Sequence, residues 1–143
     1  MSDCIFCRII NGEIPGKKIF EDDEMLAFHD INPMAPVHFL VIPKKHIENL
    51  LELEAGDSAL AGRLFHKAQE LAKQEGCEKN GGRFVVNAKK DGVQTVDHLH
   101  IHFLGGRSFG WPPGCRSWLL KNISTFLNFR KHVKSLAAPC AEL

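Results

Sequence analysis

The sequence predicts an α+β fold: a five-stranded antiparallel sheet with one long helix and a short N-terminal helix. Three observations predict it. A chain of 143 residues is long enough for a single domain with a hydrophobic core. Several apolar runs of strand length are separated by turn residues, and only residues 57–76 combine a long 3.6-residue period with end signals. Because the strands follow one another through short turns, with the helices apart from them, we expect the helices on one face.

The N-terminal half contains a short helix and three strands. Residues 4–10 place apolar side chains at helical spacing and stop at Asn11-Gly12. Residues 18–20 and 25–28 flank an acidic turn and predict a hairpin. Residues 38–42 predict a third strand, which ends at Pro43.

The long helix begins after Asp57, a good N-cap residue, and ends before Gly76, a plausible first residue beyond the helix. Its apolar residues repeat with the helical period and predict one buried face. Residues 83–87 and 99–104 predict two further strands, separated by a loop over residues 88–97.

Composition excludes several functional classes. The chain is 44% hydrophobic and 24% charged, with a formal net charge of +1, which argues against a dedicated nucleic-acid-binding protein. No apolar run reaches the ~20 residues that a membrane-spanning helix needs, and no export signal precedes Cys4. The odd number of cysteines, five, does not suit a disulfide framework. We therefore expect a cytoplasmic protein, with the nucleus as an alternative in a eukaryote.

The last part of the chain differs in charge from the rest. Residues 1–114 hold 13 Lys and Arg against 16 Asp and Glu, whereas residues 115–143 hold 5 against 1. The apolar residues after 115 fall on one helical face, with basic residues around it. We predict a domain over residues 1–114 and an extension over 115–143 that forms an amphipathic helix. Packing on its own domain is its commonest use, and contact with a membrane or partner is the alternative.

Three histidines, His98, His100 and His102, alternate with aliphatic residues. In an extended strand the three rings share one face, and Leu99, Ile101 and Phe103 point to the other. Imidazole acts as a nucleophile, a proton carrier or a metal ligand. Two strand residues advance about 6.6 Å, so His98 and His102 are too far apart to share one metal ion easily. The pattern therefore does not predict a catalytic metal ion held by all three histidines. At most one or two of the rings bind any one metal ion, and the others are free for other chemistry.

The pair Cys4 and Cys7 has three interpretations: two zinc ligands, a redox pair, or two buried small side chains of a helix. A thioredoxin-like redox motif expects a preceding strand, and the chain as given begins at Met1. Zinc needs two more ligands, for which His46 and His98 are candidates. Spacing alone leaves the zinc and packing interpretations open.

Together these residues resemble the histidine triad (HIT) family, in particular its nucleotide-binding branch. The resemblance covers residues 4–114 and rests on five motifs: Glu13-Ile14-Pro15, Phe28-His29-Asp30-Ile31 with Pro33, Ala35, Pro36 and His38, Pro43-Lys44-x-His46, Gln94-Thr95-Val96 with the three histidines, and Gly105-Gly106-Arg107 with Trp111-Pro112-Pro113-Gly114. It implies an antiparallel sheet with a long helix, in a homodimer.

The resemblance also implies an activity. Family members bind purine nucleoside monophosphates and hydrolyse phosphoramidates or related adenylates through a nucleotidylated histidine, which corresponds to His100. The alternatives are an AMP-binding adaptor with little turnover and a dinucleoside polyphosphate hydrolase. The Phe28–Ile31 motif and the Trp111–Gly114 motif favour the phosphoramidase branch.

Roles carried over by position fall into three groups. Catalysis is assigned to His100, with His102, His38 and Thr95 assisting; the nucleotide is assigned to Ile5, Phe6, Ile9, Phe28, His29, Asp30, Ile31, Asn87 and Trp111; and one structural zinc ion per chain is assigned to Cys4, Cys7, His46 and His98. Two positions depart from the family pattern, since Thr95 stands where Ser is common and Val93 where Gly is common. The resemblance implies nothing about residues 115–143.

Overall fold

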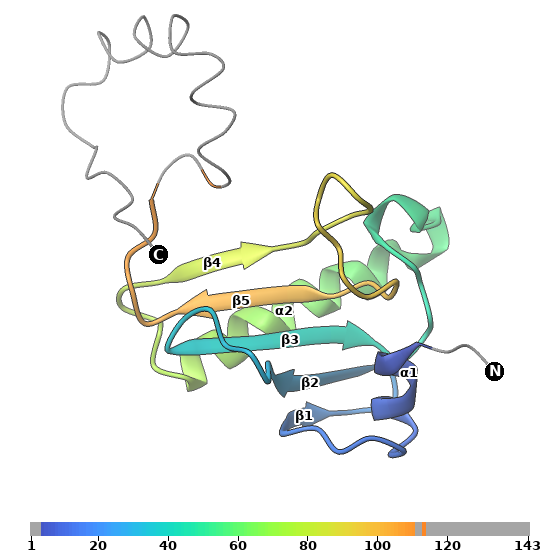
Figure 1. The fold of residues 1–143 in the computed structure, drawn as a ribbon, viewed down its shortest axis with the longest axis horizontal. Coiled ribbons are helices and arrows are strands. Elements are labelled where there is room, and N and C mark those ends of the chain that lie inside the picture. Colours follow the sequence, from blue (N-terminus) through green and yellow to red (C-terminus); the bar gives the residue numbers. More distant parts are fainter. Residues whose placement is uncertain (1–3, 111–112, 114–143) are drawn as a thin grey trace, which may run out of the picture. The chain divides into compact units, whose positions relative to one another are not determined.

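We describe a computed structural model of the chain, covering residues 4–110 and 113. The chain divides into two units, Met1–Arg107 and Ser108–Leu143. All helices and strands described below lie in the first unit (Figure 1). Of the helices in this part of the chain, none is both long and apolar enough to cross a membrane.

The first unit contains a five-stranded sheet in the order β1-β2-β3-β5-β4, with every neighbouring pair antiparallel. The strands are β1 (Lys18–Glu21), β2 (Met25–His29), β3 (Val37–Pro43), β4 (Gly82–Val85) and β5 (Ile101–Gly105). Both predicted helices are present, α1 (Ile5–Ile10) and α2 (Ser58–Gln74), and two 3₁₀ turns, Leu50–Glu52 and Ala55–Asp57, precede α2. The α+β class, the five antiparallel strands and the two helices are thus confirmed.

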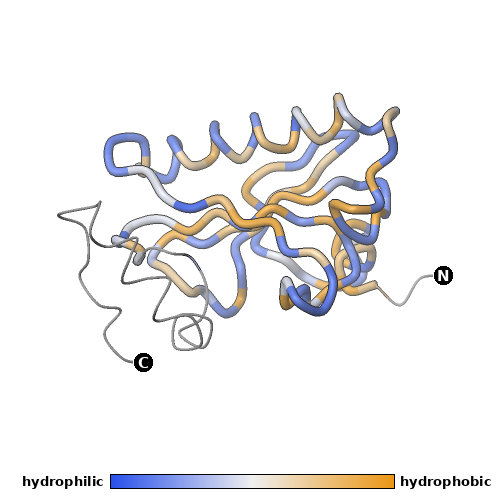
Figure 2. Tube along the Cα trace, turned by 90° about the horizontal axis from the view of Figure 1, so that it is seen from above, coloured by the Kyte–Doolittle hydropathy of each residue, from blue (hydrophilic) through white to orange (hydrophobic). Residues whose placement is uncertain are grey.

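Both faces of the sheet carry buried side chains, and each packs against a different helix. One face contributes residues such as Ala27, Phe39 and Phe103 to a core with the apolar side of α2. The alternate residues of the same strands, such as Phe28 and Leu40, form a second cluster with α1. In Figure 1 α2 lies behind the sheet and α1 in front of it, and in Figure 2 the strands next to α2 are mainly hydrophobic. The expectation that both helices share one face was wrong, because the alternation of strand side chains makes two apolar faces.

The ends of α2 follow the sequence signals only in part. Gly76 has φ +77°, and the amides of Gly76 and Cys77 donate to the carbonyls of Lys73 and Ala72, which is a Schellman motif. Asp57 occupies the N-cap position, but its side chain makes no capping hydrogen bond to α2. Instead it pairs with Lys45 Nζ at 2.6 Å. This ion pair ties the segment after β3 to the start of α2.

The last strand begins later than predicted. β5 starts at Ile101, so His98 lies in a bend and Leu99 and His100 in irregular backbone. The alternation of faces nevertheless continues, since Leu99 packs with Ile101 and Phe103 in the core beneath α2. The amide of Leu99 donates to the carbonyl of Ile47 at 2.6 Å, outside the sheet ladder. Pairing with the loop after β3 therefore replaces strand pairing where the histidines begin.

Candidate functional site

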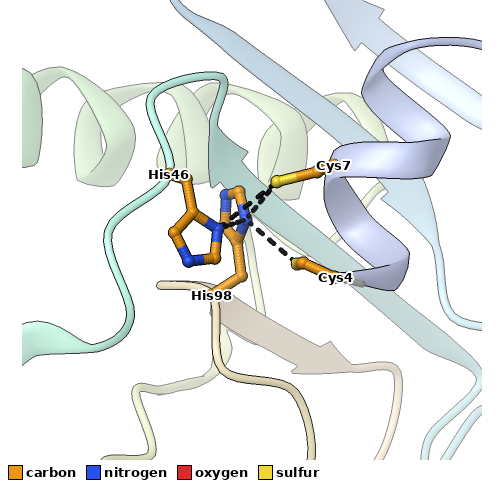
Figure 3. Close-up of side chains that lie close together, drawn as sticks. All are labelled: Cys4, Cys7, His46 and His98. Carbon is orange, nitrogen blue, oxygen red and sulfur yellow. Dashed lines mark hydrogen bonds between the residues drawn. The ribbon is translucent and has the colours of Figure 1, made fainter. Parts of the chain in front are cut away.

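Three separate segments bring together the four residues predicted as metal ligands. Cys4 and Cys7 lie at the start of α1, His46 follows β3, and His98 lies in the bend before β5 (Figure 3). The His98 ring is completely buried, the cysteines are partly buried and His46 is exposed. One potential ligand atom from each residue lies within 4.8 Å of all the others.

The distances inside this cluster fit a tetrahedral metal ion. His98 Nδ1 lies 3.5 Å from Cys4 Sγ, 3.6 Å from Cys7 Sγ and 3.2 Å from His46 Nδ1, and Cys7 Sγ lies 3.3 Å from His46 Nδ1. Tetrahedral zinc with ordinary Zn–S and Zn–N bonds separates its ligands by about 3.5 Å for N and S and about 3.3 Å for two N atoms. The donor set is therefore suited to a metal ion, and all four positions of a tetrahedral site are filled by protein.

The His98 ring is oriented by the end of β3. Its Nε2–H donates to the carbonyl oxygen of Pro43 at 2.8 Å, so Nδ1 is the unprotonated nitrogen that faces the cysteines. Burial lowers the pKa of His98 to about 4, which keeps the ring neutral as a metal ligand requires. The carbonyl of Pro43 has no signal in the sequence, because any residue could supply it.

His100 is also buried, with 2% of its surface exposed. Its Nδ1 lies 2.6 Å from the carbonyl oxygen of His98, and since a carbonyl only accepts, Nδ1 carries the proton. The lone pair is then on Nε2. Burial lowers the pKa of the His100 ring and favours this neutral form. Phe6 of α1 meets the His100 ring edge to face, with the centroids 5.4 Å apart.

His102 belongs to a different group of side chains from His98, as the strand spacing predicted. His102 Nδ1 lies 2.9 Å from His38 Nε2, and the rings of His100 and His102 meet edge to face at 4.7 Å. Asp30 Oδ2 lies 3.6 Å from His38 Nε2. Burial lowers the pKa of His102 to about 4 and also lowers the pKa of His38. His38 thus contacts His102 in this structure.

Several residues expected around a nucleotide base lie together. Phe6 and Phe28 meet edge to face at 5.5 Å, in one cluster with Ile9. This cluster also contains Leu26, Leu40 and Ile42, which the sequence analysis did not assign to the site. The sequence did contain a signal for these three residues. Apolar residues run continuously along β2 and β3, which indicates strands with two apolar faces and hence a second cluster opposite the core beneath α2.

Other predicted residues are less enclosed. Ile5 is 44% and Ile31 88% exposed, and Thr95 is exposed whereas Asn87 is partly buried. His29 is directed elsewhere: its Nε2 lies 3.7 Å from Glu75 Oε1 at the end of α2, on the opposite face from its neighbour Phe28. Trp111 lies outside the described residues.

The loop before the histidines is clamped by Gln94. Its Oε1 accepts from the Lys89 amide at 2.9 Å, and its Nε2 donates to the carbonyls of Glu48 and Val96. Val93 has φ +56°, a left-handed conformation that suits glycine and is strained for a β-branched residue. Lys89 has φ +57°. The backbone conformation at position 93 thus favours glycine, which is also the residue expected there from the family resemblance.

Comparisons with known proteins agree on one family. A family model described as the HIT domain matches residues 11–109. An uncharacterized HIT-like protein of Synechococcus elongatus is 54% identical over 112 residues, covering 78% of this chain and 97% of the relative.

Among solved structures, a HIT family hydrolase from Legionella pneumophila matches with a TM-score of 0.77 and 47% identity, covering 78% of this chain and all of that one. A histidine triad protein from Clostridium difficile matches with a TM-score of 0.74 and 41% identity, covering 81% and 98%. The fold, the alternating histidines and these matches together establish that the chain belongs to the HIT family and resembles its hydrolases.

Proposed function

We propose that the protein hydrolyses phosphorus–nitrogen bonds at the α-phosphate of purine nucleoside phosphoramidates, such as AMP joined to an amine. The observation that carries the proposal is the hydrogen bond from His100 Nδ1 to the His98 carbonyl. It leaves the lone pair on Nε2 of a buried, neutral imidazole, which is the form that attacks phosphorus. A protein that only binds nucleotides has no need of such a nucleophile.

The substrate assignments follow the chemistry of the residues. The Phe6–Phe28 cluster offers flat apolar walls to a purine, and the Asp30 carboxylate accepts hydrogen bonds from ribose hydroxyls. Asn87, Thr95 and His102 are assigned to the phosphate, where their donors stabilise negative charge. Ile5, Ile9 and Ile31 contribute to the base site, and Trp111 stays an expectation from the resemblance. His29 is the weakest assignment, because its ring faces Glu75.

The reaction proceeds in two displacements. His100 Nε2 attacks the α-phosphorus, a new N–P bond forms, and the P–N bond to the amine breaks as the amine takes a proton from water. Water then attacks the nucleotidyl-histidine, the bond to His100 breaks, and the nucleoside monophosphate leaves with neutral His100 restored. The proton that the attacking water releases neutralises the hydroxide left by the first displacement. Donors that contact the phosphoryl oxygens stabilise both transition states.

A zinc ion on Cys4, Cys7, His46 and His98 is part of the proposal, supported by the donor set and its distances. When bound, zinc would join α1 to the segments around β3 and β5. Because the four residues complete a tetrahedral site, the ion has a structural role.

We also propose a homodimer formed through β4. This strand lies at the edge of the described sheet, and Phe84 on it is 42% exposed. An edge strand presents backbone groups that a second copy of the chain can pair with. Light scattering should give twice the chain mass, and Phe84→Lys should shift the protein toward monomer; a monomeric wild type would contradict the proposal.

The decisive experiment compares substrates and one variant. The wild type should hydrolyse an AMP phosphoramidate much faster than a diadenosine polyphosphate, and rapid quenching should capture an AMP adduct. His100→Ala should lower kcat by several orders of magnitude, as nucleophile deletions do, and still bind AMP. His66→Ala, an exposed histidine on α2, is the matched control.

Three results would contradict the proposal. Preferred hydrolysis of the dinucleotide would point to the polyphosphate hydrolase, and AMP binding without turnover would point to the adaptor. A His100→Ala variant with a tenth of wild-type turnover would exclude the covalent mechanism.

A further inference from the structure

A backbone amide determines where His38 carries its proton. The Met34 N–H donates to His38 Nδ1 at 3.1 Å. Because an amide N–H only donates, Nδ1 of His38 has no proton, and the proton of the neutral ring is on Nε2. His38 is 5% exposed, so water does not compete freely for these atoms.

His38 in turn fixes the tautomer of His102. His38 Nε2 and His102 Nδ1 are 2.9 Å apart. Since His38 Nε2 carries a proton, His102 Nδ1 accepts it, and the proton of the neutral His102 ring is on Nε2. His100 has the opposite arrangement, with its proton on Nδ1 and its lone pair on Nε2. Two neighbouring rings in edge-to-face contact are thereby fixed in opposite tautomers.

A metal ion is the competing explanation for this cluster. Asp30, His38 and His102 have potential ligand atoms within 4.8 Å of one another. However, a metal ion on His38 Nε2 would have to displace the proton that the Met34 amide keeps there. The hydrogen-bond chain explains the same contacts with every donor facing an acceptor.

We infer that His38 is a positioning residue that fixes His102 as a neutral Nε2–H donor, which stabilises charge on the phosphoryl oxygens and does not deliver a proton to the leaving amine. This inference rests on the proposed function. An additional proton on the pair would face a donor, since His102 Nδ1 faces His38 Nε2–H and His38 Nδ1 faces the Met34 amide. Burial and the nearby His100 and His38 rings lower the pKa of His102, and Asp30 opposes them in part.

Nitrogen NMR of the full wild-type chain tests the tautomers directly. Two-bond ¹H–¹⁵N correlations distinguish a protonated ring nitrogen from an unprotonated one, and single His→Gln variants assign the signals. At neutral pH we expect His102 to be protonated at Nε2 alone and His100 at Nδ1 alone. A His102 ring protonated at Nδ1, or at both nitrogens, would overturn the inference. This measurement needs no substrate, so it is independent of the proposed phosphoramidase activity.

Two substitutions at His38 test its effect on catalysis. His38→Leu removes the donor to His102, and loss of one hydrogen bond predicts a fall in kcat of about tenfold with little change in KM. His38→Gln keeps a side-chain N–H and should restore kcat to within a few-fold of wild type. His66→Gln is the control for an exposed histidine.

The outcomes are separable. A His38→Leu protein with wild-type kcat and an unchanged His102 spectrum would overturn the inference. Thermal unfolding shows whether the His38 variants fold. If neither does, the NMR spectrum of the wild type alone decides whether His102 carries its proton on Nε2. If the wild type cleaves no phosphoramidate, the proposed function fails, and the spectrum still tests the tautomers.

Discussion

At the scale of single residues, main-chain groups determine the chemistry of the histidines. The carbonyls of Pro43 and His98 fix the rings of His98 and His100, and the amide of Met34 fixes His38. These contacts are invisible in a sequence, because every residue has a carbonyl and nearly every residue an amide. The alternation of the histidines predicts which side chains react, whereas their tautomers could be assigned only from the structure.

The lowered pKa of His102 predicts how stability changes with pH. The ring has a pKa of about 4 in the folded protein and about 6.5 in an unfolded chain, so the unfolded state binds more protons below pH 6.5. The free energy of unfolding should therefore fall as the pH drops from about 6.5 to 4, by about 3 kcal/mol from this residue. Urea titrations at several pH values measure it.

His102→Asn provides the comparison for this prediction. Asn keeps an acceptor for His38 Nε2–H and does not titrate, so its unfolding free energy should depend less on pH than that of the wild type. Effects of metal release at low pH are common to both proteins and cancel in the difference. Equal slopes for the two proteins would show that His102 is not buried as a neutral ring.

Val93 predicts a stabilising substitution. A β-branched residue at φ +56° carries strain that glycine does not, although glycine costs more chain entropy. Val93→Gly should raise the free energy of unfolding by about 1 kcal/mol, measured by urea denaturation. Val93→Ala keeps a Cβ and should therefore raise the free energy of unfolding by less than Val93→Gly does. Destabilisation by glycine would mean that the exposed Val93 side chain makes a contact that outweighs the strain.

At the scale of elements, two groups of contacts attach α1 to the rest of the described fold. The helix has six residues, too few to be stable alone, and it packs on the sheet through Phe6 and Ile9. Its two cysteines, with His46 and His98, supply a second attachment. Because Phe6 contacts His100, the position of α1 also affects the site.

Metal removal should therefore act first on α1. Protein purified without added metal should contain one zinc ion per chain by elemental analysis, and Cys4→Ser with Cys7→Ser should lose the zinc and lower Tm markedly. Cys77→Ala removes a buried thiol outside the cluster and should retain zinc. If the wild type contained no zinc and the double variant had the same Tm as the wild type, the result would instead support packing as the role of Cys4 and Cys7.

The elements themselves were largely predictable because their signals are local. Gly76 and Pro43 mark ends that the structure confirms. The start of β5 was misplaced, since the segment from His98 to His100 bonds to a loop and to its own backbone. Which face each helix covers was also missed, because strand alternation shows that two faces are apolar but not what covers them.

At the scale of the whole molecule, one sheet separates two kinds of environment. The face beneath α2 is core, and the other carries the aromatic cluster, the histidines and the residues positioned to hold a metal ion. From the sequence alone, a long-range pair such as Cys4 with His98 was only a candidate, because spacing left the zinc and packing interpretations equally open. The family resemblance was needed to prefer zinc. Ligand sets that span distant segments depend on topology.

The extension over residues 115–143 is predicted to be dispensable for catalysis. The residues assigned to the site all lie at or before Trp111. The extension has a net charge of +4 and residues 1–114 have −3, but salt at physiological concentration makes the attraction between them weak. A chain ending at Gly114 should keep its kcat/KM within a few-fold and should remain a dimer, with twice the mass of the shortened chain by light scattering. Loss of activity or of the dimer would assign the extension to the fold.

His98 contributes to the two parts of the site through different atoms. Its ring faces the cysteines, whereas its main-chain oxygen holds His100. The main-chain contribution does not depend on the side chain, so a genetic library randomised at position 98 should separate two phenotypes. Substitutions of His98 that preserve the backbone should abolish metal binding and keep the orientation of the His100 ring. A substitution of His100 removes that ring itself, so the two effects cannot be separated there. If the proposed zinc site exists, position 98 is therefore where natural variation can remove metal binding without first disturbing the orientation of His100.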